Sequence, residues 1–120
     1  MITQQTITAT VATGETGATA DTSFIGGEIL KVAMDVTGNS MDINLDSIGE
    51  QKAQAIIDYT GNTDSTFYPR AFAQKIDGTD LLYTTGEEVP VEFVVYGTLR
   101  LTLASAAAAE TVTMTITYRT

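Results

Sequence analysis

The C-terminal third of the chain alternates between apolar and polar residues almost without error. Residues 99–103 and 112–118 carry an apolar side chain at every second position, with threonine or arginine between them. The apolar positions are Leu99, Leu101, Leu103, Val112, Met114, Ile116 and Tyr118. Because successive side chains of a β-strand leave opposite faces of a sheet, this period predicts strands with one buried face. We expect the two segments to pair antiparallel, with one apolar face and one face lined by threonine.

Shorter stretches with similar character occur throughout the chain. Further strands are expected at residues 3–13, 28–36, 41–46, 66–74, 81–84 and 89–96. The turn-forming sequence Thr-Gly-Asn-Ser at 37–40 predicts that the strands on either side of it form a hairpin. Pro69 lacks a backbone donor, so the strand there is at an edge, is bulged, or begins after the proline. Eight or nine short strands about ten residues apart are typical of a single all-β domain, a sandwich or a barrel, over residues 1–120.

Three segments do not follow the alternation. Residues 14–23 are small, polar and aperiodic, which predicts a surface loop or an arm that is ordered only against a neighbouring subunit. Residues 50–55 favour a short helical turn leading into a strand, with Ser47 as its cap and Glu50 three residues later. The alanine-rich connection at 104–110 is either a tight link packed on its own core or a loop tip that lies under a neighbouring chain.

The composition argues against several kinds of chemistry. The chain has no cysteine and no histidine, so disulfides, thiolate metal sites and a Ser-His-Asp triad are excluded. Fifteen acidic residues against six basic ones give a formal charge of −9, and the basic residues form no cluster along the sequence. We therefore expect no binding to nucleic acid or to anionic membranes. We expect no secretory signal either, and no apolar run approaches the roughly 20 residues of a membrane span.

The acidic residues offer only weak candidates for a functional site. Asp58, Asn62 and Asp64 place oxygen atoms close together in one turn, but the spacing is not that of an EF-hand loop. Ordinary turn chemistry is therefore favoured over calcium binding. Carboxylate pairs of the glycosidase type arise by chance in so acidic a chain. The pairs considered involve Glu87, Glu88 and Glu92. We expect no catalytic residue, no cofactor and no metal site.

The aromatic residues in the middle of the chain suggest a core or a subunit contact. They are Tyr59, Phe67, Tyr68, Phe72 and Tyr83. Such side chains bury a large area, and tyrosine keeps a polar tip, so both roles are common for them. A face for stacking sugars is the less favoured alternative.

The segment at 89–96 is the strongest indication of assembly. Its second half, Phe-Val-Val-Tyr at 93–96, is apolar on both faces, and Gly97 then marks a bulge or a sharp corner. A single sandwich covers only one face of a strand. The second face must therefore meet a helix, a loop or another subunit.

Three segments give the chain a familiar character: Asp-Val-Thr-Gly-Asn-Ser-Met-Asp at 35–42, Tyr-Pro-Arg-Ala at 68–71 and Phe-Val-Val-Tyr-Gly-Thr-Leu-Arg-Leu-Thr-Leu at 93–103. With these segments the chain resembles, over most of its length, small structural proteins of tailed-bacteriophage virions, in particular head decoration or cement proteins. These segments are framework and contain no catalytic motif. The resemblance implies a jelly-roll-like antiparallel β-sandwich, often trimeric, on the outside of an icosahedral shell. It also implies an N-terminal arm, here residues 1–23, that clasps the capsid or adds a strand to a neighbour.

The resulting hypothesis is a non-enzymatic virion protein that stabilises the phage head by bridging capsomers. Its expected partners are the major capsid protein and further copies of itself in a trimer, and its expected location is the capsid exterior after assembly in the host cytoplasm. The expected interface residues are Ile7, Val11, Phe67, Tyr68, Arg70, Phe72, Phe93, Val95 and Tyr96. Three alternatives remain: a carbohydrate- or receptor-binding domain of a tail fibre or spike, a surface-layer domain without a specific ligand, and an enzyme.

Overall fold

The protein is an all-β domain, as the alternation predicts. The computed structural model describes residues 1–50, 52–72 and 90–120. The strands are β1 (Ile2–Thr10), β2 (Ala18–Asp21), β3 (Ile25–Thr37), β4 (Met41–Ile48), β5 (Gln54–Gly61), β6 (Ser65–Phe67), β7 (Ala71–Phe72), β8 (Pro90–Val91), β9 (Phe93–Ala104) and β10 (Thr111–Arg119). In these described ranges there is no helix, and so none that could cross a membrane. The strand expected at 81–84 lies outside them.

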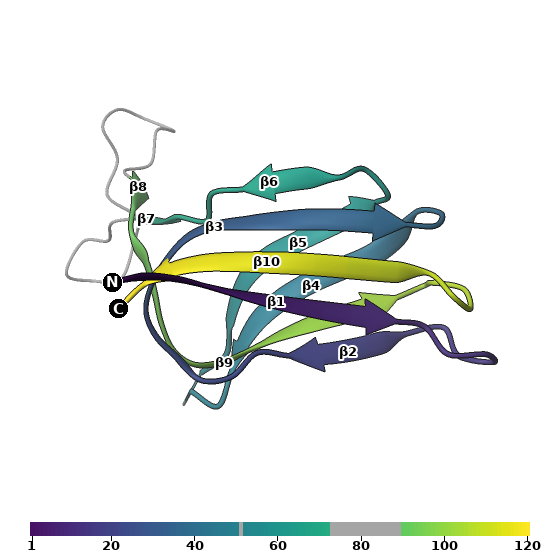
Figure 1. The fold of residues 1–120 in the computed structure, drawn as a ribbon, viewed down its shortest axis with the longest axis horizontal. Coiled ribbons are helices and arrows are strands. Elements are labelled where there is room, and N and C mark those ends of the chain that lie inside the picture. The colour runs from purple at the N-terminus through teal and green to yellow at the C-terminus, as the bar shows by residue number, and fades with distance from the viewer. Residues whose placement is uncertain (51, 73–89) are drawn as a thin grey trace.

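The strands form two packed layers that share a corner (Figure 1). One layer contains β1, β10, β3 and β6, and the other contains β2, β9, β4 and β5. Strand β9 joins the layers, because its first residues pair with Ile25–Ile29 of β3 and its later residues pair with β2 and β4. All these pairings are antiparallel, and the sandwich predicted from the sequence is confirmed.

The corner in β9 lies at Gly97. This residue pairs with Ile25 of β3, whereas the next residue, Thr98, pairs with Ile48 of β4. A side chain at Gly97 would place its Cβ atom 2.6 Å from the backbone oxygen of Ile48. Only glycine lets the two backbones approach so closely, which explains the corner expected at this position.

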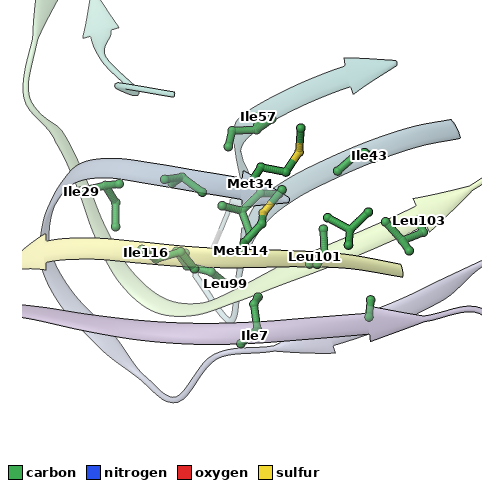
Figure 2. Packing of buried hydrophobic residues seen from close by; sticks show 14 of the residues in the cluster. Ile7, Ile29, Met34, Ile43, Ile57, Leu99, Leu101, Leu103, Met114 and Ile116 are labelled. Atoms are coloured by element: carbon green, nitrogen blue, oxygen red, sulfur yellow. The ribbon is translucent and has the colours of Figure 1, made fainter. Parts of the chain in front are cut away.

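The core fills the space between the layers with the apolar side of each alternating strand (Figure 2). All seven apolar residues of the C-terminal alternation are buried, and the threonines between them are mostly half-buried or exposed. Met34 and Met114 come from neighbouring strands of one layer, while Ile43 and Leu101 come from the other. The period of two therefore predicted correctly which side of each strand is covered.

Two predicted strand pairs are wrong, although the four segments concerned do form strands. Strands β9 and β10 do not pair with each other, and neither do β3 and β4. In both cases the connection crosses from one layer to the other, so the apolar faces of successive strands meet across the core instead of lying side by side. Alternation reports which face is buried, and it contains no information about which neighbour covers that face.

Two segments have a different local structure from the expected one. The polar stretch at 14–23 contains β2, which pairs with β9, and residues 1–23 as a whole contribute two strands to the chain's own fold. The helical turn expected at 50–55 is absent from the described residues there, and β5 begins at Gln54. The Ser47 hydroxyl does donate to the Glu50 carboxylate, at 2.5 Å, but it also accepts from the Gln54 N–H, at 3.0 Å. The expected capping pair thus closes the link between β4 and β5.

The alanine-rich connection at 104–110 packs on its own domain. Ala106 is buried in the core, and its N–H donates to the Thr16 oxygen at 2.9 Å. Ser105 and Ala109 adopt positive φ angles of 53° and 68°, which lets the chain reverse within a few residues. Of the two roles considered for this connection, the structure favours the tight link.

Candidate functional site

Large apolar side chains are exposed together at the end of the sandwich where the two termini meet. They are Met1, Ile2, Phe24, Val94 and Tyr96, with exposed fractions of 89, 60, 55, 62 and 71%. We call this set the apolar end. Strand register places Val94 beside Glu28, Glu28 beside Arg119, and Arg119 beside Ile2. The two apolar residues therefore stand on either side of an ion pair, in which Arg119 Nη1 and Glu28 Oε2 are 3.5 Å apart. An uncovered apolar surface of this kind is a common mark of an interaction site.

A hollow of about 310 Å³ lies at one side of the apolar end. Its lining residues are Asp21, Phe24, Ile48, Gly49, Tyr96, Gly97 and Thr98. The rings of Phe24 and Tyr96 meet edge to face, with their centroids 4.8 Å apart and their planes at 87°. The hollow therefore sits beside the corner of β9, between the end of β2 and the link that follows β4.

Glu50 fixes the backbone that carries Tyr96. Its carboxylate accepts from the N–H of Tyr96 at 3.2 Å and also from Ser47 and Gln54. The hydrogen bond from Ser47 is the main cause that lowers the pKa of Glu50, with those from Gln54 and Tyr96 adding to it. The carboxylate thus holds the Tyr96 backbone from the link that follows β4.

An ion pair forms the polar rim of the hollow. The Nε and Nη2 atoms of Arg100 donate to the two carboxylate oxygens of Asp21 at 2.8 and 3.0 Å. This contact lowers the pKa of Asp21. Both side chains are more than 40% exposed, so solvent screens the pair and its contribution to stability is small. Its clear effect is geometric, since it aligns a planar donor and a planar acceptor beside two exposed rings.

The predicted interface residues divide into buried and exposed groups. Ile7, Val11, Phe93 and Val95 are at most 9% exposed and belong to the chain's own core, so the fold gives them a different role from the expected one. Phe67 is half-buried against Tyr59, with ring centroids 5.9 Å apart. The exposed members of the set are Tyr68, Arg70 and Tyr96. Phe72 lies in β7, but its side chain is outside the described part of the structure.

The three side chains considered for calcium binding each contact a different part of the chain. Asp64 accepts from the Val36 N–H at 2.8 Å, and Asn62 donates to the Gly38 oxygen at 3.2 Å. Asp58 faces the amide of Asn44 on the neighbouring strand. No group of three acidic side chains that could hold a metal ion occurs among the residues described. Of the other candidates, Tyr83, Glu87 and Glu88 lie outside those residues.

The raised pKa of Asp46 predicts that the stability of the fold depends on pH. Partial burial raises the pKa of Asp46 above the usual 3.8, and the nearby negative charge of Asp58 adds to this effect. The folded state therefore holds the proton more tightly than the unfolded state, and stability falls as the pH rises through this range. We expect Asp46→Asn to be more stable than the wild type at neutral pH and to lose that advantage below pH 3.8. Thermal melts across this pH range measure the difference.

The matched control for Asp46 is Asp35→Asn, at an exposed position on the other layer. It should show a smaller gain at neutral pH. A constant difference between Asp46→Asn and the wild type at every pH would contradict the explanation by ionisation.

Phe24 is the site residue that sequence reasoning missed. It lies in the irregular stretch between β2 and β3, where no periodicity marks it as exposed. Its partner Tyr96 was recognised as part of a segment with two apolar faces, and Val94 shares that uncovered face. Comparisons of the chain with protein-family models, with curated proteins and with solved structures found no match.

Proposed function

We propose that this chain is a non-enzymatic structural protein that binds to a larger assembly through its apolar end, most specifically a decoration protein on the head of a tailed bacteriophage. The observation that supports this is the group of exposed side chains at the apolar end, where Val94 and Ile2 flank the Glu28–Arg119 ion pair. The resemblance of the framework segments to virion proteins supplies the particular assembly. Its partners are then the major capsid protein and further copies of the chain.

The scaffold suits such a role because its binding surface is preorganised. Val94 and Tyr96 stand on a continuous strand, and the β9 corner and Glu50 hold that strand in position. Little ordering entropy is lost when a rigid surface of this kind is covered. Several copies on one shell would bind together much more tightly than one copy, because each further contact forms at a high effective concentration.

The test is binding to empty heads assembled from the major capsid protein of the phage that encodes this chain. We expect wild-type protein to sediment with the heads, and Val94→Glu to reduce this by more than about tenfold, because it places a charge in the centre of the contact. The control is Thr8→Ala, which changes an exposed residue of β1 away from the apolar end. If wild-type protein stays in the supernatant at all concentrations, the proposed function is wrong.

Carbohydrate binding, as in a tail fibre or spike, is the second candidate function. It is favoured by one observation, the hollow in which two aromatic rings stand beside the Asp21–Arg100 pair. Aromatic faces and aligned polar groups are what a sugar ring requires. A glycan array separates the candidates: specific glycan binding that Tyr96→Ala abolishes would favour this second function.

A further inference from the structure

We propose that the hollow receives Tyr68 of a second copy of the chain, so that copies join head to tail. This proposal rests on the proposed function, for which it supplies the contact between subunits. In a single chain Tyr68 is exposed to solvent and the hollow is open to solvent. One is a protruding aromatic side chain, and the other is a concave surface lined by aromatic and aliphatic groups.

Tyr68 is well placed to act as the protruding group. It is 64% exposed and follows β6 directly, before the chain reaches β7. Pro69 restricts the backbone after it. The Arg70 guanidinium donates to the Pro69 oxygen at 2.7 Å, which folds the Arg70 side chain back on the residue before it. Tyrosine has few rotatable side-chain bonds and so loses little conformational freedom when it is buried, which is one reason why tyrosines often dominate protein contacts.

The hollow of the same chain is out of reach of this tyrosine. Tyr68 does not line it. The two sites also lie on opposite sides of the sandwich, since β6 follows one long edge in Figure 1 while β2 follows the other. Strand β6 pairs with β3, whereas the hollow adjoins the end of β2 and the corner of β9. A Tyr68 side chain that enters the hollow must therefore belong to a second copy of the chain.

The charges around Tyr68 and around the hollow also favour this contact. Arg70 is an exposed cation two residues beyond the inserting ring. Asp21 on the rim of the hollow is paired with Arg100, which also neighbours Asp46 in the strand register. With the Glu50 carboxylate that accepts from the Tyr96 N–H, the described charges on this side remain acidic in sum. The chain as a whole has a charge of −9, which opposes unspecific association. A contact that brings Arg70 to this acidic side reduces the repulsion locally and selects one relative orientation.

The contact joins two different surfaces and is therefore heterologous. Repetition of such a contact gives a closed ring or an open chain. A ring of three copies agrees with the trimer that the resemblance to decoration proteins implies. It would also leave Ile2 and Val94 free for the capsid, so the subunit contact and the capsid contact use separate parts of the apolar end.

Sedimentation analysis of mixed variants tests the proposal. Tyr68→Ala removes the protruding group and keeps the hollow, whereas Tyr96→Ala damages the hollow and keeps the protruding group. We expect wild-type protein to sediment at about three times the mass of one chain and each variant alone to sediment as a monomer, with association weakened more than about tenfold. A mixture of the two variants should form a one-to-one dimer, because one intact contact remains.

Further variants address folding and charge. Ile2→Ala removes an exposed apolar side chain outside the contact and should keep the wild-type mass. Arg70→Glu should weaken association, and high salt should reduce the difference from wild type. The folded state of each variant is checked by its amide spectrum, and both tyrosines are exposed enough to be replaced without opening the core.

Three results would overturn the proposal. They are a wild-type monomer at millimolar concentration, variants that keep the wild-type mass, and a mixture of Tyr68→Ala and Tyr96→Ala that stays monomeric. The outcome is independent of the capsid assay. If monomers bind to empty heads, only the subunit contact fails; if trimers form but ignore the heads, only the proposed function fails.

Discussion

Replacing Leu101 with alanine is expected to lower the free energy of unfolding by about 3–4 kcal/mol. Leu101 is fully buried in the middle of β9 and lies between Ala20 of β2 and Leu45 of β4. In Figure 2 its side chain projects into the space between the two layers. Because both neighbouring strands hold β9 in place, the structure cannot close around the lost atoms, and a cavity adds to the lost burial. Urea denaturation followed by far-UV circular dichroism measures the change.

Two controls make the Leu101 measurement specific. Leu101→Met conserves most of the volume and should cost less than about 1.5 kcal/mol. Thr102→Ala lies on the opposite face of the same strand and should change stability by less than about 0.5 kcal/mol. If Thr102→Ala were as damaging as Leu101→Ala, the assignment of the buried face would be wrong.

The assignment of that face is the part of the fold that the sequence predicts best. In a half-buried strand each side chain contributes to the pattern through its own burial, so the long alternations of β9 and β10 give a clear signal. Strand β2 has only four residues, Ala-Thr-Ala-Asp, and its two small apolar side chains give almost none. Its position depends on contacts with β9, including the hydrogen bond that the Thr22 N–H donates to the Leu99 oxygen at 2.9 Å. Such long-range contacts cannot be detected in a local pattern.

The candidate site was only half predictable for the same physical reason. The excess of apolar residues at 93–96 is a local property, and it predicted a second face that the sandwich itself does not cover. Val94 and Tyr96 on that face are exposed. The hollow depends instead on Phe24 and Ile48, which come from two other parts of the chain. These residues meet Tyr96 only because β9 changes partner at Gly97. Composition also offered no reason to separate the exposed Tyr68 from the half-buried Phe67 beside it.

A second large effect is expected at the opposite end of the sandwich, where Glu110→Ala should lower the free energy of unfolding by about 3 kcal/mol. Glu110 is only 7% exposed, and its carboxylate joins two connections that cross between the layers. One oxygen accepts from the Ala107 N–H at 2.6 Å, and the other accepts from the Asn39 N–H. Alanine would remove the shared acceptor of two N–H groups, at the exposed residues Asn39 and Ala107, and would open space beside Gly38.

The Gln variant distinguishes hydrogen bonding from packing at this position. Glu110→Gln keeps the size of the side chain, but its amide has one accepting oxygen, and its nitrogen would face a donor. We expect it to lose about half as much stability as Glu110→Ala in the same urea titration, about 1.5 kcal/mol. Equal losses in the two variants would mean that charge matters more than satisfied donors. A negligible loss in both would show that the connections hold without the carboxylate. The expected graded loss would show that Glu110 stabilises the two connections, β3–β4 and β9–β10, that run from one layer to the other. Alternation alone cannot reveal that these connections cross between the layers.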